Sequence, residues 1–165
     1  MAFNHRADLN PHQQYRIKKL KRELNRAETY AEWKEIALSL DQETGAQEWK
    51  YDNSSPYFDA EIISHRLNML RRYKLQNRVV DLIYILREGL SHDVANIGHP
   101  MLFTQTYVGT KKIIEDYIHE VCESLIFIAS QKCDSLSIKE KIDFFQNCQL
   151  AYGQPAMMFS GGASL

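Results

Sequence analysis

Apolar residues recur three or four positions apart in six segments between residues 11 and 150, a spacing that gathers them on one face of an α-helix. Two of these segments open with a capping-box pattern, a hydroxyl residue followed three positions later by glutamate: Thr29 with Glu32, and Ser137 with Glu140. The sequence therefore predicts a mainly α-helical domain of five or six helices.

Asn10 and Pro11 suit the cap and the first turn of the first helix. The expected apolar stripes are Ile17 to Leu24, Trp33 to Leu40, Ile62 to Leu70, Val79 to Leu90, Ile113 to Ile128 and Ile142 to Leu150. In the fifth helix, about 110–130, we expect Ile118 to share the buried face with Ile114 and Val121. Residues 49–59 and 91–109 are rich in turn-forming residues and are predicted to be loops.

The last eleven residues depart from the helical pattern. Residues 155–159 form a short apolar run without helical period, and residues 160–165 contain the glycine pair Gly161–Gly162. A buried strand followed by a glycine turn is the economical interpretation, although so short a run does not separate strand from helix. A lone strand leaves its backbone groups without partners. We therefore expect a helical domain over residues 1–150 and, over 151–165, the start of a truncated α/β domain.

Composition narrows the function classes. The chain has 165 residues, 44% of them hydrophobic, and a net charge of −1, which excludes a strongly basic general nucleic-acid binder. The three cysteines are too widely spaced for a disulfide framework or a paired zinc site, which favours an intracellular setting. No signal peptide or spanning segment is recognisable, so any membrane contact is expected to be peripheral.

The glycine pair is the most chemically suggestive feature. Consecutive small residues after a strand let several backbone N–H groups point the same way. Such a nest binds phosphate or stabilises the oxyanion of an ester-hydrolysis intermediate. A plain turn is the alternative.

Four segments resemble, in the same order, parts of a known family: TYAEWKEIALSLDQETGAQEWK, SPYFDAEIISHRLNMLR, LIYILREGLSHDVANIGHPMLF and YVGTKKIIEDYIHEV. They are similar to the N-terminal helical domain of the patatin-like triacylglycerol lipases of fungi, plants and bacteria. Phe144–Phe145, Tyr152–Gly153 and residues 157–165 resemble the stretch that leads that family into its first strand and glycine loop. The resemblance covers roughly three-quarters of the chain or more.

The resemblance implies a lipase with a Ser–Asp dyad, its nucleophile in Gly-x-Ser-x-Gly and its base in Asp-Gly-Gly/Ala. It also implies that Gly161, Gly162 and Ala163 are oxyanion-hole residues. Neither dyad motif occurs in this chain, so no catalytic residue is assigned here, and the catalytic domain is expected after Leu165. Ser164 follows the glycines rather than the strand, so it is not interpreted as the nucleophile. The expected substrate is triacylglycerol or a related acyl ester.

Other polar residues are given structural interpretations. His92 and His99 are expected to be structural or solvated, because neighbours in sequence such as Ser91, His92 and Asp93 rarely form a triad. The acidic residues on the helices are interpreted as solvated or held in local ion pairs. No cluster has metal-ligand spacing, so we expect neither a metal site nor a cofactor.

The first helix is strongly basic, and its cations are the candidates for contact with a lipid surface: Arg16, Lys18, Lys19, Lys21, Arg22 and Arg26. A basic amphipathic helix can lie on an anionic membrane or lipid droplet with its apolar stripe at the acyl boundary. Alternatively, the stripe packs on the domain and leaves the cations in water. A non-catalytic interaction or lipid-surface module is the alternative to the lipase, and nucleic acid is not an expected partner.

Overall fold

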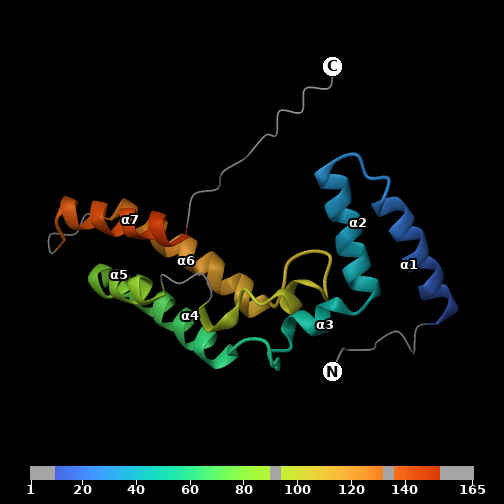
Figure 1. Cartoon of the computed structure of the whole chain (residues 1–165), viewed down its shortest axis with the longest axis horizontal. Coiled ribbons are helices and arrows are strands. Elements are labelled where there is room, and N and C mark those ends of the chain that lie inside the picture. The colour runs from blue at the N-terminus through green and yellow to red at the C-terminus, as the bar shows by residue number, and fades with distance from the viewer. Residues whose placement is uncertain (1–9, 90–93, 132–135, 153–165) are drawn as a thin grey trace, which may run out of the picture.

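The computed structural model describes residues 10–89, 94–131 and 136–152. Within these ranges the chain forms seven α-helices, two short 3-10 segments and no strand. Figure 1 shows an elongated molecule with a two-helix hairpin at one end and a helical bundle at the other. The expectation of a mainly α-helical domain is confirmed, whereas the expected strand and glycine turn lie outside the described residues.

The hairpin consists of α1 (Pro11–Leu24) and α2 (Tyr30–Glu43), which pack against each other. The short helix α3 (Ala46–Tyr51) follows α2 and contacts both α2 and α6, so it connects the hairpin to the bundle. The bundle contains α4 (Ala60–Leu75), α5 (Val79–Glu88), α6 (Lys112–Ser130) and α7 (Ile138–Tyr152). Between α5 and α6 lie the 3-10 segments η1 (Val94–Asn96) and η2 (Pro100–Phe103).

The predicted caps at Asn10, Thr29 and Ser137 are present, but the capping box expected at Thr29 and Glu32 is incomplete. The Thr29 hydroxyl accepts the Glu32 N–H at 3.2 Å, whereas the Glu32 carboxylate accepts the N–H of Glu28 instead of that of Thr29. The boxes at Asn10 and Ser137 are complete. The Asn10 side chain accepts the Gln13 N–H at 2.8 Å, and the Gln13 side chain accepts the Asn10 N–H at 3.2 Å. At α7, the Ser137 hydroxyl accepts the Glu140 N–H at 3.2 Å, and the Glu140 carboxylate accepts the Ser137 N–H at 2.8 Å. These reciprocal bonds satisfy backbone groups that have no partner inside the helix.

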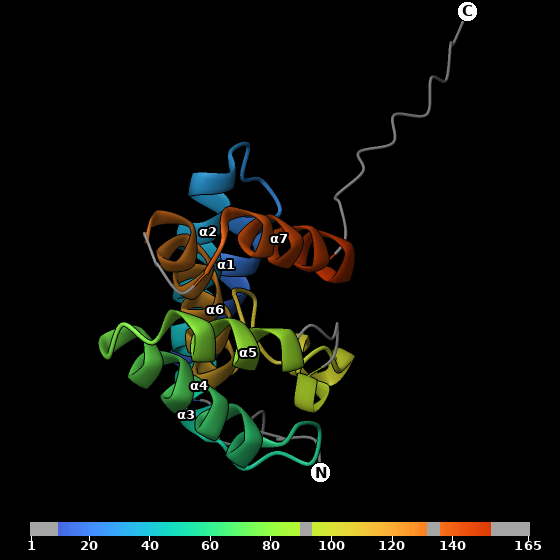
Figure 2. The same ribbon diagram turned by 90° about the vertical axis from the view of Figure 1, so that its left-hand side faces the viewer.

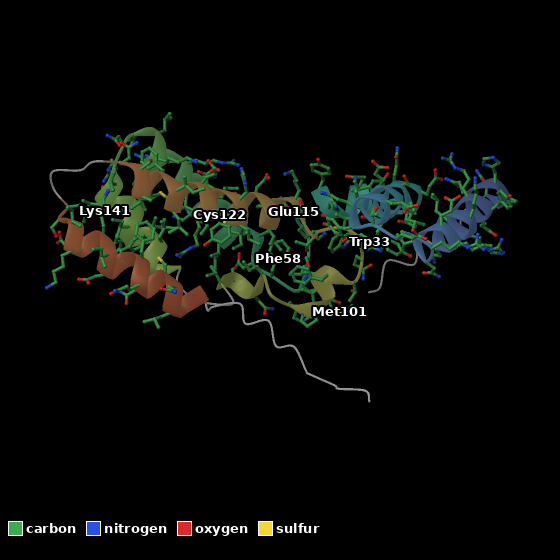
Figure 3. The ribbon with its side chains drawn as sticks, turned by 90° about the horizontal axis from the view of Figure 1, so that it is seen from above. Trp33, Phe58, Met101, Glu115, Cys122 and Lys141 are labelled. Atoms are coloured by element: carbon green, nitrogen blue, oxygen red, sulfur yellow. The ribbon has the colours of Figure 1, made fainter. Side chains whose placement is uncertain are left out.

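The main hydrophobic core lies inside the bundle. Its most deeply buried members come from α4 to α7 and from η2: Ile63, Leu82, Leu102, Ile114, Ile128 and Phe144. A smaller set of buried residues, Ile17, Ala37 and Leu40, belongs to the hairpin. Figure 3 shows the same separation of the hairpin from the bundle, and in Figure 2 the molecule is seen end-on with the hairpin behind the bundle. The hairpin therefore depends on α3 and the neighbouring loop to hold its position.

Some local predictions were wrong. Four residues of the expected apolar stripes are exposed: Ile62, Val80, Ile142 and Leu150. The described residues also form one α-helix more than the five or six expected, the short α3. Residues 49–51 were assigned to a loop but form the end of α3, a six-residue helix too short to show an apolar period. Ile118 was placed on the buried face of α6, yet it is 48% exposed, because it lies at the edge of the stripe that contains Ile114 and Val121. None of the described helices covers that edge enough to bury it.

Candidate functional site

The six basic candidates on and after α1 are all exposed. Arg16 forms an ion pair with Glu43 of α2 at 2.9 Å, and Lys19 pairs with Glu23 at 3.7 Å. The remaining four make no ion pair within the described part of the chain: Lys18, Lys21, Arg22 and Arg26. The outward face of α1 is therefore positively charged and only partly compensated. We call these six residues the basic face.

The apolar stripe of α1 does not face solvent. Ile17 is buried, and Leu20 and Leu24 are half-buried on the helix that packs against α2. Of the two alternatives for this stripe, packing on the domain is the one that the structure shows, because the stripe already covers α2. A 68% exposed aromatic residue, Tyr15, is the large apolar side chain that α1 leaves in solvent. Any lipid contact through α1 must consequently rest on its charge.

A buried carboxylate attaches the loop before α6 to α2. Asp41, at 0% exposure, accepts the backbone N–H of Tyr107 at 2.7 Å and that of Val108 at 3.0 Å, one with each oxygen. Hydrogen bonds to a charged acceptor are about twice as strong as neutral ones. These two bonds therefore fix the loop, residues 104–111, against the hairpin.

Two lysines also attach the loop before α6 to α3 and to the residue that follows α3. Lys50 of α3 donates to the carbonyl of Val108 at 2.6 Å. Lys111, which is 1% exposed, donates to the carbonyls of Trp49 at 2.7 Å and Asp52 at 2.6 Å. We call Asp41, Lys50 and Lys111 the junction, since together they connect α2, α3 and the start of α6.

Burial changes the acid–base behaviour of the junction. Burial lowers the pKa of the Lys111 ammonium, and the nearby Asp52 carboxylate opposes that shift. The pKa of Asp52 is itself lowered, first by a hydrogen bond from the Ser54 hydroxyl and then by one from the Ser54 backbone. The shift at Asp52 is thus local, whereas the shift at Lys111 follows from its burial in the junction and gives the junction a pH dependence that can be measured.

The turn before α6 is fitted closely around a glycine. Gly109 has a φ of +74°, and a Cβ there would lie 2.0 Å from the Glu115 carboxylate. That carboxylate accepts the N–H of Thr110 at 2.9 Å, while the Thr110 hydroxyl donates to the Leu102 carbonyl at 2.6 Å. In Figure 3, Glu115 lies near the middle of the molecule, between the labelled Trp33 and Cys122.

A cavity of about 260 Å³ lies beside the junction, lined by Thr44, Gly45, Ala46, Glu48, Trp49, Asp52 and Gln105. Pockets that hold drug-sized ligands have volumes of roughly 300–1,000 Å³. The cavity is therefore smaller than a site for an acylglycerol.

The junction was not predicted from the sequence, because no local pattern distinguishes its three charged residues from ordinary surface residues.

The three predicted oxyanion-hole residues lie outside the described part of the chain: Gly161, Gly162 and Ala163. Ser164 and His92, to which no catalytic role was assigned, also lie outside it. His99 has a structural role, because its Nδ1 accepts the Met101 N–H at 3.2 Å and its ring stacks on Tyr57. Among the residues that the structure describes, no group of His, Cys, Asp or Glu could hold a metal ion.

The acidic residues on the helices follow the predicted local pairing only in part. Lys112 with Asp116 and Arg78 with Asp81 are local ion pairs. Glu120 is different, since it is 7% exposed and pairs across to Arg71 and Lys74 of α4. No described helix is both long enough and apolar enough to cross a bilayer.

Comparison with known proteins adds the family. Residues 11–150 match the family described as Domain of unknown function (DUF3336). The chain belongs to the DUF3336 family. The match covers all seven helices apart from the last residues of α7.

Several curated proteins resemble this chain over most of its length. A triacylglycerol lipase, ptl1, of Schizosaccharomyces pombe is 32% identical over 136 residues, 82% of this chain and 25% of the relative. A patatin-like phospholipase domain-containing protein of Yarrowia lipolytica is 34% identical over 145 residues, 87% of this chain and 17% of the relative.

A plant relative extends the same pattern. The triacylglycerol lipase SDP1L of Arabidopsis thaliana is 32% identical over 151 residues, 92% of this chain and 18% of the relative. The chain thus spans a quarter or less of these three relatives. The predicted resemblance to patatin-like triacylglycerol lipases is confirmed. No solved structure matches the chain.

Proposed function

We propose that this chain is the N-terminal helical portion of a patatin-like serine lipase that hydrolyses triacylglycerol or related acyl esters. The observation that carries the proposal is the match to named lipases along 82–92% of the chain. The dyad motifs are missing from these 165 residues, so the proposal places catalysis in a domain after Leu165. Gly161, Gly162 and Ala163 are proposed as the first oxyanion donors of that domain.

The coding sequence beyond Leu165 tests this proposal. We expect a Gly-x-Ser-x-Gly motif within a few dozen codons, followed by an Asp-Gly-Gly/Ala motif. The longer protein should release fatty acid from triolein, and replacing the motif serine with alanine should abolish that release. The chain of 165 residues alone should hydrolyse no p-nitrophenyl ester above the uncatalysed rate. A stop codon directly after Leu165 would overturn the proposal.

We also propose that the basic face of α1 brings this portion to an anionic lipid surface inside the cell, either a membrane or a lipid droplet. The support is the exposure of all six cations and the absence of ion pairs at four of them within the described residues. Attraction to an anionic leaflet contributes about 1 kcal/mol per Lys or Arg near the surface. Because the apolar stripe is buried, the contact is electrostatic and stops at the headgroups.

Vesicle sedimentation tests this contact. A combined Lys18→Glu, Lys19→Glu and Lys21→Glu variant should bind phosphatidylserine-containing vesicles more weakly than the unmodified chain. A matched control with the same change in net charge replaces exposed or half-exposed lysines elsewhere: Lys34→Glu, Lys112→Glu and Lys139→Glu. Binding should also weaken with salt, since screening acts over about 10 Å at 0.1 M. Equal losses in both variants would show a response to net charge alone.

The second candidate is a non-catalytic helical interaction or lipid-surface module. The observation that favours it is the missing dyad, because a free-standing chain of this sequence has no nucleophile elbow. The downstream coding sequence separates it from the lipase. Capture of RNA by the basic face in place of lipid would instead support a nucleic-acid role.

A further inference from the structure

The turn between α4 and α5 exposes an unusual apolar side chain. Leu75, the last residue of α4, is 89% exposed, more than any other large apolar residue that the structure describes. Ile126 of α6 is 63% exposed and lines a groove of about 650 Å³ together with Leu75 and Phe127. Figure 2 shows this turn projecting at the left edge of the molecule. Exposed apolar clusters of this kind commonly mark interaction sites.

Cations surround the leucine. Four lie within eight residues of sequence: Arg71, Arg72, Lys74 and Arg78. Two of them form ion pairs with the buried Glu120 carboxylate: the Arg71 Nε lies 3.3 Å and the Lys74 Nζ 2.5 Å from its oxygens. The Arg71 side chain nevertheless stays 52% exposed. Arg72 is exposed and makes no ion pair with the described residues.

Acidic residues lie near these four cations and reduce the net positive charge around Leu75. Asp81 pairs with Arg78 at 2.8 Å, and Glu123 is one of the residues that line the groove. Counting Glu120 as well, the cluster has four cations against three acids. The attraction of this turn to anions is therefore modest, and its apolar residues must supply the larger part of any binding.

Helix stability does not explain the leucine. Cations in the last turn of a helix interact favourably with the helix dipole, which accounts for Arg72 and Lys74 without any partner. Leu75 gains nothing from that effect, and its apolar surface is unfavourable in water. A protruding apolar residue among snorkelling cations is the arrangement that peripheral proteins present to the boundary between headgroups and acyl chains.

We infer that the α4–α5 turn is a second lipid-contact site, at which Leu75 and Ile126 enter an anionic lipid surface while Arg71, Arg72 and Lys74 meet its phosphates. The inference rests on the proposed function, because it assumes that the protein works at a lipid surface. This site differs from the basic face in its location and in the interaction that would hold it to the lipid. The two lie at opposite ends of the molecule (Figure 1), and the turn binds mainly by apolar insertion.

The first experiment measures binding of the full chain to vesicles of phosphatidylcholine mixed with phosphatidylserine. Leu75→Ser should weaken binding about tenfold, since partial burial of one leucine contributes on the order of that factor. The matched control is Leu150→Ser, the same change at a residue that is 80% exposed on α7. Arg72→Glu should also weaken binding, and Lys139→Glu, on exposed α7 surface, should not.

The second experiment detects insertion directly. Leu75→Cys is placed in a chain with Cys122→Ser and Cys133→Ser, and the new thiol is labelled with an environment-sensitive fluorophore. Its emission should shift to the blue when anionic vesicles are added, and part of the shift should persist at high salt. Vesicle binding without any shift would overturn the inference. So would loss of self-association in Leu75→Ser without lipid, because the turn would then be a contact between copies of this chain.

The two lipid proposals can fail separately. If the Lys18, Lys19 and Lys21 reversal abolishes binding while Leu75→Ser and Arg72→Glu bind normally, the basic face stands and the second site is wrong. If Leu75→Ser abolishes binding while the α1 reversal does not, the second site stands and the basic face is wrong. If the unmodified chain does not bind the vesicles that contain phosphatidylserine, both are wrong.

Discussion

The Lys111 ammonium lies 4.0 Å from the centre of the Trp49 ring and donates a hydrogen bond to the backbone carbonyl of the same residue. The two residues come from different elements, since Trp49 belongs to α3 and Lys111 directly precedes α6. A cation over an indole face is attracted by the ring quadrupole, most strongly where water is excluded. This pair therefore helps set the angle at which the hairpin meets the bundle.

Lys111→Met should lower the free energy of unfolding by about 2 kcal/mol, because two partly buried carbonyls lose their donor while the side-chain volume is kept. Lys112→Met is the matched control, since Lys112 lies one residue away in an ion pair with Asp116 whose side chains are 43% and 35% exposed. It should cost less than about 0.5 kcal/mol. Urea unfolding followed by circular dichroism measures both. Equal losses would mean that the junction contributes no more than a surface ion pair.

The same pair has a distinctive pH dependence. Burial lowers the pKa of Lys111 in the native state, so between that pKa and the ordinary value near 10.4 the unfolded chain binds more protons. Unfolding then becomes harder as the pH rises through that window. The stability advantage of the unmodified chain over Lys111→Met should therefore grow from pH 7 towards pH 10. An advantage that shrinks over this range would show that Lys111 is not desolvated.

How far the fold could be predicted depends on the distance between interacting residues. The caps at Asn10 and Ser137 involve partners three residues away, so the sequence pattern was sufficient for them. Lys111 reaches Trp49 over 62 positions and Asp41 reaches Tyr107 over 66, and no local pattern announces such pairs. Composition also argues against them, because lysine and aspartate are rarely buried. The junction was therefore visible only in three dimensions.

The candidate site likewise has features that local sequence spacing predicts and features that depend on distant residues. The basic residues of α1 were recognised because helical spacing separates Lys18 and Arg22 from the apolar positions. That the stripe is occupied by α2 could not be predicted, because an apolar stripe fits a neighbouring helix and an acyl boundary equally well. Leu75 was overlooked because a single apolar residue at a helix end carries no period.

Asp41→Asn should destabilise the chain by about 2–3 kcal/mol. The amide keeps only one acceptor oxygen, and its NH2 group then faces a backbone N–H of Tyr107 or Val108. Asp143→Asn, on the exposed side of α7, controls for the change of charge and should have little effect. Hydrogen exchange adds a local measurement, since the amides of Tyr107 and Val108 should lose protection first. Unchanged protection at both would contradict the role given to Asp41.

Glu140→Gln should destabilise α7, and the size of this destabilisation should depend on pH. Hydrogen bonds from the Ser137 hydroxyl, and then from its backbone, hold the pKa of Glu140 below its ordinary value. A carboxylate with a depressed native pKa stabilises the fold above its unfolded pKa, and this stability is lost as the pH falls through the native pKa. The variant should thus be less stable than the unmodified chain at pH 7, and the difference should shrink as the pH falls below the ordinary glutamate value near 4.3. Lys139→Gln, a neighbouring exposed position, should show no such convergence.

Thiol reactivity should distinguish two cysteines of the bundle. Cys122 is exposed on α6, whereas Cys148 is buried in the core, and burial raises the pKa of the Cys148 thiol against the opposing charge of Arg87. The thiolate is the reactive form, so both access and ionisation protect Cys148.

In a Cys133→Ser chain at pH 8, a disulfide reagent such as DTNB should modify one thiol promptly. The second should react about a hundredfold more slowly and should accelerate in urea, because it waits for the bundle to open. Two equally fast thiols in the folded chain would mean that α7 does not cover the core as described, and Cys122→Ser identifies which thiol is fast.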